Sequence, residues 1–231
     1  MKWFREYIFF LFFLLCSGLC IAQDKEKQQD GLSVDGPYVM YDSTGGVRVV
    51  RVDERGVLRD TVYADLPAGF TLEVVSEKGG HRFRVPLHPI ERPAWKTGQK
   101  EKTLIISDPH GDLESFISVL RNNGVIGKDY NWKFGKNQVI IIGDVFDRGK
   151  DVLPIFWLIY KLEQEAREAG GVMTFMLGNH EEMVLRNNLK YTRGKYTNLA
   201  DSLGMKYADL WHGNSELGRW LRSRNLMQIV G

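Results

Sequence analysis

The stretch VIIIGDVFDRG, residues 139–149, joins an apolar strand directly to a charged turn. Four β-branched residues lead into Gly143, and Asp144, Asp147 and Arg148 follow within the next five positions. A short apolar run bounded by a glycine turn is typical of a strand buried in a parallel sheet. Two carboxylates and a guanidinium at the end of such a strand indicate a functional site.

Two other apolar strands end in the same way. TLIIS (103–107) runs into DPHGD, and VMTFML (172–177) runs into GNHEE. Helical patterns near 112–122 and 151–169 separate the three strands, so the order βαβαβα predicts a parallel sheet with right-handed crossovers. Because parallel strands present their carboxyl ends at one edge, the three polar clusters are expected to converge there.

The expected cluster combines carboxylates, imidazoles, an amide and one guanidinium. Its carboxylates would repel one another unless cations were present, and Arg148 supplies only one positive charge. Oxygen and imidazole ligands suit Mn, Fe or Zn, so we expect bound divalent metal. Nearby residues also have simple structural roles, Asp112 as a helix N-cap and Glu181 and Glu182 as favourable charges in a first helical turn. The residues expected to converge are Asp108, His110, Asp144, Asp147, Arg148, Asn179 and His180.

Several other function classes lack their signature. The chain has no GxGxxG or GxxxxGK[ST] phosphate cradle and no GxSxG nucleophile elbow. Its formal net charge of +2 is too small to indicate nucleic acid as a partner.

Residues 1–22 have the composition of a secretory signal peptide. Lys2 and Arg5 precede an apolar run that ends at a small residue, Ala22, and the run is shorter than a membrane-spanning helix requires. We expect cleavage after Ala22, export to the periplasm or outside the cell, and no membrane contact afterwards. The alternatives are an uncleaved anchor or a lipoprotein modified at Cys16 or Cys20, and these are the chain's two cysteines.

The remaining chain divides by composition. We expect a disordered lead-in (23–30), a small all-β module of four or five strands (31–92), a polar linker (93–102) and an α/β domain (103–231). The β module holds eight Lys and Arg against nine Asp and Glu, so its arginines are expected to pair across strands or face solvent rather than form a binding patch. His81 and His88 are expected at the surface.

The motifs DPHGD, GDVFDRG and GNHE, in this order, resemble those of the calcineurin-like metallophosphoesterases. The DRG and NHE endings are similar to the phosphoprotein-phosphatase group, which also contains diadenosine-tetraphosphate hydrolases. KLEQEAREAGGVMTFMLGNHEEMVLRN (161–187) further resembles the Shewanella-like protein phosphatases. The resemblance implies a metallophosphoesterase-type fold that hydrolyses phosphate monoesters, of proteins on Ser/Thr or Tyr or of small molecules, by water attack at two divalent metal ions.

The resemblance also implies a role for each motif residue. Asp108 and His110 would bind the first metal, Asp144 would bridge both, and Asn179 would bind the second. His180 would protonate the leaving group or orient the phosphate. Asp147 would hold His180, and Arg148 would bind phosphate oxygens.

One departure from the family pattern concerns two later motifs, His-Gly-Gly and Gly-His, whose histidines complete the metal site. The printed sequence contains neither motif after GNHE, and His212 in DLWHGN precedes a helix-like segment instead of ending a strand. We therefore expect a fragment of a longer gene product, whose sheet is incomplete at its C-terminal end and leaves apolar surface uncovered. Two alternatives to a phosphate-monoester hydrolase remain. One is a dinucleoside-polyphosphate hydrolase or other phosphoesterase, and the other is a truncated, inactive module that binds phosphate or metal.

Overall fold

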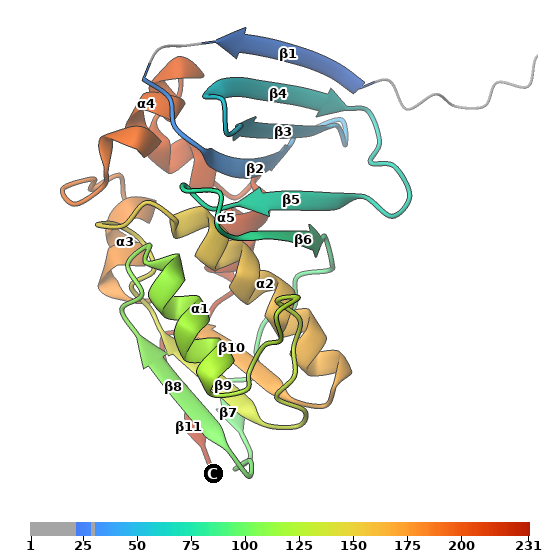
Figure 1. Ribbon diagram of the computed structural model, residues 1–231, viewed down its shortest axis with the longest axis vertical. Coiled ribbons are helices and arrows are strands. Elements are labelled where there is room, and N and C mark those ends of the chain that lie inside the picture. The colour runs from blue at the N-terminus through green and yellow to red at the C-terminus, as the bar shows by residue number, and fades with distance from the viewer. Residues whose placement is uncertain (1–21, 29–30) are drawn as a thin grey trace, which may run out of the picture.

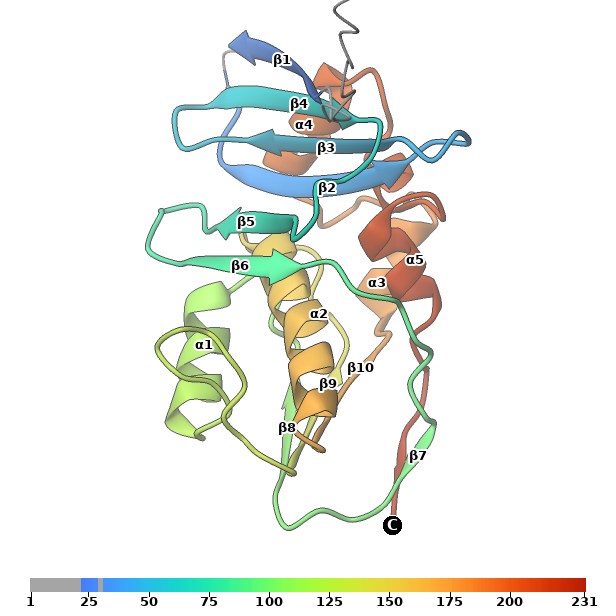
Figure 2. The same ribbon diagram turned by 90° about the vertical axis from the view of Figure 1, so that its right-hand side faces the viewer.

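The computed structural model describes residues 22–28 and 31–231. Figures 1 and 2 show β strands gathered at one end of the molecule and an α/β layer at the other, with helix α2 running between them. Apart from Ala22, the expected signal peptide lies outside the described residues, and its cleavage and the export it implies stay predictions. Within the described part, no helix combines the length and apolarity needed to cross a membrane.

The α/β part is built on a three-stranded parallel sheet in the order β10–β9–β8. The strands are β8 (Thr103–Ser107), β9 (Gln138–Ile142) and β10 (Val172–Met176). Ser107 and Met176 both pair with Ile142, so the three strands end in line and their following loops start from one edge. This confirms the expected sheet and the convergence of the strand ends.

Two helices connect these strands. Helix α1 (Leu113–Asn122) begins at the N-cap Asp112, whose carboxylate accepts the Ser115 N–H, as the sequence predicts. Helix α2 (Val152–Glu168) is buried on nearly all sides because it packs both on β10 and on strands of the β module. The apolar core is therefore continuous from the α/β part into the β module.

The β module contains two antiparallel sheets. One has the order β1–β4–β3–β2, and the other is the β5–β6 hairpin. The strands are β1 (Ala22–Gln28), β2 (Asp35–Tyr41), β3 (Val47–Val52), β4 (Val57–Tyr63), β5 (Thr71–Val75) and β6 (Arg82–Pro86).

The C-terminal part is helical and returns to the linker. Its elements are α3 (Asn179–Leu185), α4 (Gly194–Ser202), the short 3-10 helix η1 (Tyr207–Trp211), α5 (Glu216–Arg222) and strand β11 (Ile229–Val230). Strand β11 pairs in parallel with β7 (Lys96–Thr97), which lies within the expected linker. The helix-like segment expected after His212 is present as α5.

Two expectations for the N-terminal region differ from the structure. The polar segment expected as a disordered lead-in forms β1 over Ala22–Gln28, paired with β4. Strand pairing uses backbone groups, so an open strand edge can order a segment that has no apolar pattern.

The second difference concerns the histidines expected at the surface. His81 is only 9% exposed, and its ring nitrogens contact the Tyr130 hydroxyl and the Glu114 carboxylate. His88 is half-buried and stacks on Tyr160 with ring centroids 3.9 Å apart. Both lose exposure because they lie between the β module and the α/β part, a contact that has no local signal in the sequence.

Helices α1 and α2 cover one face of the parallel sheet (Figure 1). Apolar side chains remain uncovered elsewhere on it, with Ile105 58% exposed and Ile142 45% exposed. The exposed apolar surface expected for this sheet is therefore present among the described residues.

Asp35, at the start of β2, allows a test of how the β module is held. Its carboxylate accepts the Tyr38 hydroxyl, and burial raises the pKa of Asp35 to about 6 even though Lys195 nearby lowers it. The folded protein thus takes up a proton that the unfolded chain releases near pH 4, and stability falls as pH rises from about 4 to about 6.

We predict that Asp35→Asn removes this loss. Between pH 4 and pH 7, the free energy of unfolding of the unmodified chain should fall by about 3 kcal/mol relative to that of the variant. One pKa unit corresponds to about 1.4 kcal/mol, and the pKa of Asp35 is raised by about two units. Urea unfolding at a series of pH values measures the difference. Parallel pH profiles for the two proteins would contradict the assignment.

Candidate functional site

The three strand-end loops meet as the sequence predicts. The ligand atoms of His110, Asp144 and His180 all lie within 4.8 Å of one another. Asp108 is adjacent, with Oδ1 3.7 Å from Nε2 of His110. Residues from three separate strand ends therefore share one cluster of carboxylate and imidazole groups.

The backbone of these loops is held in an uncommon conformation. Asp108, His110, Asp144, Asp147 and Arg148 all have positive φ, between 40° and 72°. Non-glycine residues rarely adopt the left-handed region, at a cost of order 1–3 kcal/mol each, and they persist only where surrounding contacts enforce it. Such residues concentrate at functional sites, and five of them occur here within the two loops that follow β8 and β9.

Two glycine contacts allow the loops to approach this closely. A Cβ on Gly143 would lie 2.3 Å from the backbone nitrogen of Gly178, and a Cβ on Gly149 would lie 2.3 Å from the carbonyl carbon of Gly111. Any side chain at these positions would separate the loops, because such distances are far below van der Waals contact.

Glu181 is the organising residue that the sequence reasoning missed. Its buried carboxylate accepts four backbone N–H groups: Oε2 from Asp144 and Gly178 at 2.7 and 2.8 Å, and Oε1 from Val145 and Phe146 at 2.9 and 3.3 Å. Burial raises the pKa of Glu181 above its ordinary value, while these four N–H donors act in the opposite direction. A glutamate three residues after a helix-starting glycine has capping-box spacing, and that spacing is the local signal for it.

His110 is oriented so that one ring nitrogen is available. Its Nδ1 lies 2.8 Å from the carbonyl oxygen of Phe146, which can only accept a hydrogen bond, so Nδ1 carries the proton. In the neutral ring, Nε2 is then a free acceptor that faces Asp108. A carbonyl contact of this kind commonly fixes the tautomer of a metal-binding histidine.

His180 is fixed by a chain of buried polar contacts. Its Nδ1 lies 2.7 Å from Oδ2 of Asp147, and Oδ1 of Asp147 accepts the Thr192 hydroxyl at 2.7 Å. Its backbone N–H donates to Oδ1 of Asp144 at 3.0 Å. The Asp147 contact occupies Nδ1, so Nε2 is the ring nitrogen of this buried side chain that remains for a ligand, and the ring lies 5.4 Å from that of Tyr191.

Arg148 and Asn179 lie at the solvent side of the cluster. Both are exposed, and within the part of the chain that the structure describes the Arg148 guanidinium has no ion-pair partner. Its backbone is nevertheless fixed, because its N–H donates to the Tyr191 carbonyl at 3.3 Å and its carbonyl accepts from the Arg193 side chain. His212 is exposed and does not belong to the cluster.

The β module braces the turn that follows Arg148. The ammonium of Lys195, on α4, donates to the carbonyls of Val34 and Lys150 at 2.6 and 2.7 Å and pairs with Glu77 at 2.7 Å. The Glu77 N–H donates to the carboxylate of Asp151, the N-cap residue of α2, at 2.6 Å. These contacts tie the β5–β6 turn to the loop that carries Arg148.

The donor set fits a divalent metal. Carboxylate and imidazole are the ligands that Mn, Fe and Zn accept, and Nε2 of His110 lies 3.7 Å from Oδ1 of Asp108. Without a bound cation, three acidic or imidazole groups within 4.8 Å of one another would not be stabilised by lying so close together. The fold and the cluster therefore define a class of protein, an α/β domain with a candidate metal site at the carboxyl end of a parallel sheet.

Comparison with known proteins agrees with this class. A family model described as calcineurin-like phosphoesterase matches residues 101–229, more than half of the chain. The chain belongs to the calcineurin-like phosphoesterase family.

Similar proteins carry phosphatase names. Shewanella-like protein phosphatase 2 of Arabidopsis thaliana is 38% identical over 95 residues, which are 41% of this chain and 24% of that protein. A solved cold-active protein tyrosine phosphatase is 29% identical with a TM-score of 0.74, covering 87% of this chain and 58% of that one. A second, from a psychrophilic Shewanella species, is 28% identical with a TM-score of 0.73, covering 86% and 59%.

The matched fraction of each chain shows how far the similarity extends. The structural match includes more of the chain than residues 101–229, so it extends into the β module. The chain spans about a quarter of the Arabidopsis relative and under two thirds of the solved structures.

We predict that Glu181→Gln lowers the free energy of unfolding by roughly 2–4 kcal/mol. Whichever way the amide is turned, its NH₂ group faces backbone N–H donors that the carboxylate now accepts. Urea unfolding provides the measurement. Glu182→Gln is the matched control, because that side chain is 53% exposed and should change stability by at most about 0.5 kcal/mol. Equal effects of the two substitutions would contradict the role of Glu181.

Proposed function

We propose that this protein is a metal-dependent phosphatase that hydrolyses phosphate monoesters at a binuclear site. The observation that carries the proposal is the cluster of His110, Asp144 and His180, with Asp108 beside it and the exposed Arg148 at its rim. Bound metal ions would polarise the phosphate and lower the pKa of an attacking water. Asp108, His110, Asp144 and Asn179 are the residues we assign to hold them.

The other site residues are assigned to the phosphate. Arg148 offers a planar guanidinium that matches two phosphate oxygens. Asp147 holds the His180 ring, so that Nε2 can donate a proton to the leaving oxygen or a hydrogen bond to the phosphate. The Thr192 hydroxyl on Asp147 restricts this pair to one orientation.

The site also has a feature that favours aryl phosphates. Tyr191 is 43% exposed and its ring lies beside His180. An aromatic leaving group would pack against that ring as it accepts the proton, with a gain of about 0.5–1.5 kcal/mol over contact area alone. Among phosphorylated proteins and small molecules, we therefore propose phosphotyrosine-like esters as the favoured substrates, in keeping with the names of the similar solved structures.

We also propose that the protein acts after export, on the basis of the signal-like segment 1–22. That compartment favours phosphate monoesters over dinucleoside polyphosphates, which are mainly cytoplasmic.

The central test is Asp144→Asn. Turnover of p-nitrophenyl phosphate with added Mn²⁺ should fall by at least about a hundredfold, because a neutral amide at the position shared by two metal ions cannot offset their charge as a carboxylate does. Calorimetric titration with Mn²⁺ measures binding separately from turnover. Asp112→Asn is the control on a neighbouring loop, since asparagine caps a helix as well as aspartate does. Full turnover in Asp144→Asn, or metal binding unchanged from the unmodified chain, would contradict the proposal.

The aryl preference is tested by Tyr191→Ala. We expect kcat/KM for phosphotyrosine to fall about three- to tenfold, with that for phosphoserine changed less than twofold, because only the aromatic group loses its contact. Arg186→Ala, an exposed side chain that follows α3, is the control. An equal loss on both substrates would show that Tyr191 supports the loop rather than the substrate.

A further inference from the structure

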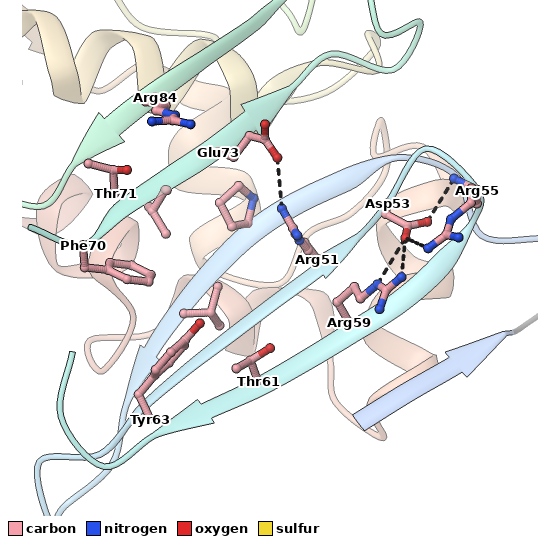
Figure 3. Close-up of a pocket in the computed structure, with 13 residues that line it drawn as sticks. Arg51, Asp53, Arg55, Arg59, Thr61, Tyr63, Phe70, Thr71, Glu73 and Arg84 are labelled. Carbon is pink, nitrogen blue, oxygen red and sulfur yellow. Dashed lines mark hydrogen bonds and ion pairs between the residues drawn. The ribbon is translucent and has the colours of Figure 1, made fainter. Parts of the chain in front are cut away.

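The β module contains a cavity of about 690 Å³, which we call the arginine groove. Figure 3 shows it between β3 and β4 on one side and the β5–β6 hairpin on the other. Its lining residues are Pro37, Val49, Arg51, Asp53, Arg55, Arg59, Thr61, Tyr63, Phe70, Thr71, Leu72, Glu73 and Arg84.

Positive charge is concentrated on this face of the module. Four arginines and two acidic residues line the groove, whereas the module as a whole has slightly more acidic than basic residues. The strand alternation causes the segregation, because Arg51 and Arg59 point into the groove while the Arg48–Asp60 ion pair lies on the opposite face of β3 and β4. The β module is therefore nearly neutral as a whole, although this groove is basic.

The two acidic residues in the groove are each shared among several guanidinium groups. Oδ2 of Asp53 contacts Arg55 at 3.4 Å and Arg59 at 3.0 Å. Glu73 pairs with Arg82 at 2.8 Å and only distantly with Arg51, at 3.5 Å. Among the described residues, the Arg51 guanidinium has only this long contact to Glu73, so most of its N–H donors are in excess.

Arg84 increases this excess. It is exposed on β6 directly opposite Glu73, and over the described residues its guanidinium has neither a hydrogen bond nor an ion pair. A groove with surplus guanidinium donors is suited to carboxylates or other planar anions.

The other end of the groove has a different chemistry. Tyr63 and Phe70 meet edge to face with ring centroids 5.5 Å apart, and Leu72 and Val49 lie among the lining residues. Figure 3 shows Tyr63 and Phe70 together at one end and Asp53, Arg55 and Arg59 at the other. A ligand that fills the groove must therefore combine an apolar group with negative charge.

The length of the groove favours a polypeptide. It follows β4 from Arg59 to Tyr63, a distance of about 13 Å at about 3.3 Å per residue, which matches about four extended residues. A nucleic acid fits less well, because Asp53 and Glu73 would repel its continuous phosphate backbone, whereas separated carboxylates can avoid them.

We propose that the arginine groove is a docking site for an extended, acidic segment of another polypeptide. An aromatic or large apolar side chain packs against Tyr63 and Phe70, and acidic side chains pair with Arg51 and Arg84. This binding is distinct from the proposed catalysis and needs no metal.

Fluorescence anisotropy with a labelled synthetic peptide tests the proposal on the full chain without added metal. The peptide is about eight residues long, with one phenylalanine followed by glutamates that alternate with serine. We expect saturable binding that weakens as salt rises from about 50 to about 300 mM. Peptides with lysine for glutamate, or alanine for phenylalanine, should bind about tenfold more weakly or not at all.

The double variant Arg51→Gln/Arg84→Gln should weaken binding of the acidic peptide about tenfold, because each guanidinium–carboxylate contact contributes on the order of a threefold change. Lys78→Gln is the matched control, since it removes a positive charge from the β5–β6 turn outside the groove. Both variants should keep an unchanged Tm and unchanged turnover of p-nitrophenyl phosphate, so a failed docking site and a failed phosphatase assignment are distinguishable.

Three results would overturn the docking site. One is the absence of saturable binding by the acidic peptide, and another is equal binding by the lysine peptide. The third is tighter binding of a single-stranded oligonucleotide of the same length, which would make the groove a general polyanion site.

Discussion

The Glu181 carboxylate is the contact on which the site geometry depends. By accepting the N–H groups of three consecutive loop residues and of Gly178, it joins the end of β9 to the start of α3. The loop after β9 cannot satisfy these donors with its own carbonyls, because it turns too sharply. One buried anion therefore replaces the water that the loop would otherwise need.

This contact explains how the strained backbone persists. The left-handed conformations at Asp144, Asp147 and Arg148 each cost free energy, which must be offset by contacts outside the loop. Glu181 supplies them from one side, and the Tyr191 carbonyl and Thr192 hydroxyl supply them from the other. The site residues are consequently fixed before any ligand binds, which is the condition for precise transition-state contacts.

The β module is structurally inseparable from this arrangement. It shares an apolar core with α2, and Lys195 bridges it to the loop carrying Arg148. Part-buried contacts of His81 with Tyr130 and Glu114 add polar interactions over the same interface. The module thus contributes to positioning the proposed phosphate-binding arginine, and the arginine groove gives it a binding surface of its own.

The sequence alone determined the alternation of strands and helices in the parallel sheet, the bounds of β8, and the convergence of the three polar clusters. These follow from local signals, since apolar runs, glycine turns and the N-cap Asp112 each act within a few residues, and parallel topology then fixes the shared edge. The roles of Glu181, Thr192 and Lys195 were decided only in the tertiary structure. Their partners Val145, Asp147 and Val34 lie 36, 45 and 161 residues away in the sequence. A contact between two polar groups so far apart leaves no periodic pattern from which it could be predicted. The pairing of β1 and the burial of His81 and His88 were hidden for the same reason, because each depends on a surface that exists only after the rest of the chain has folded.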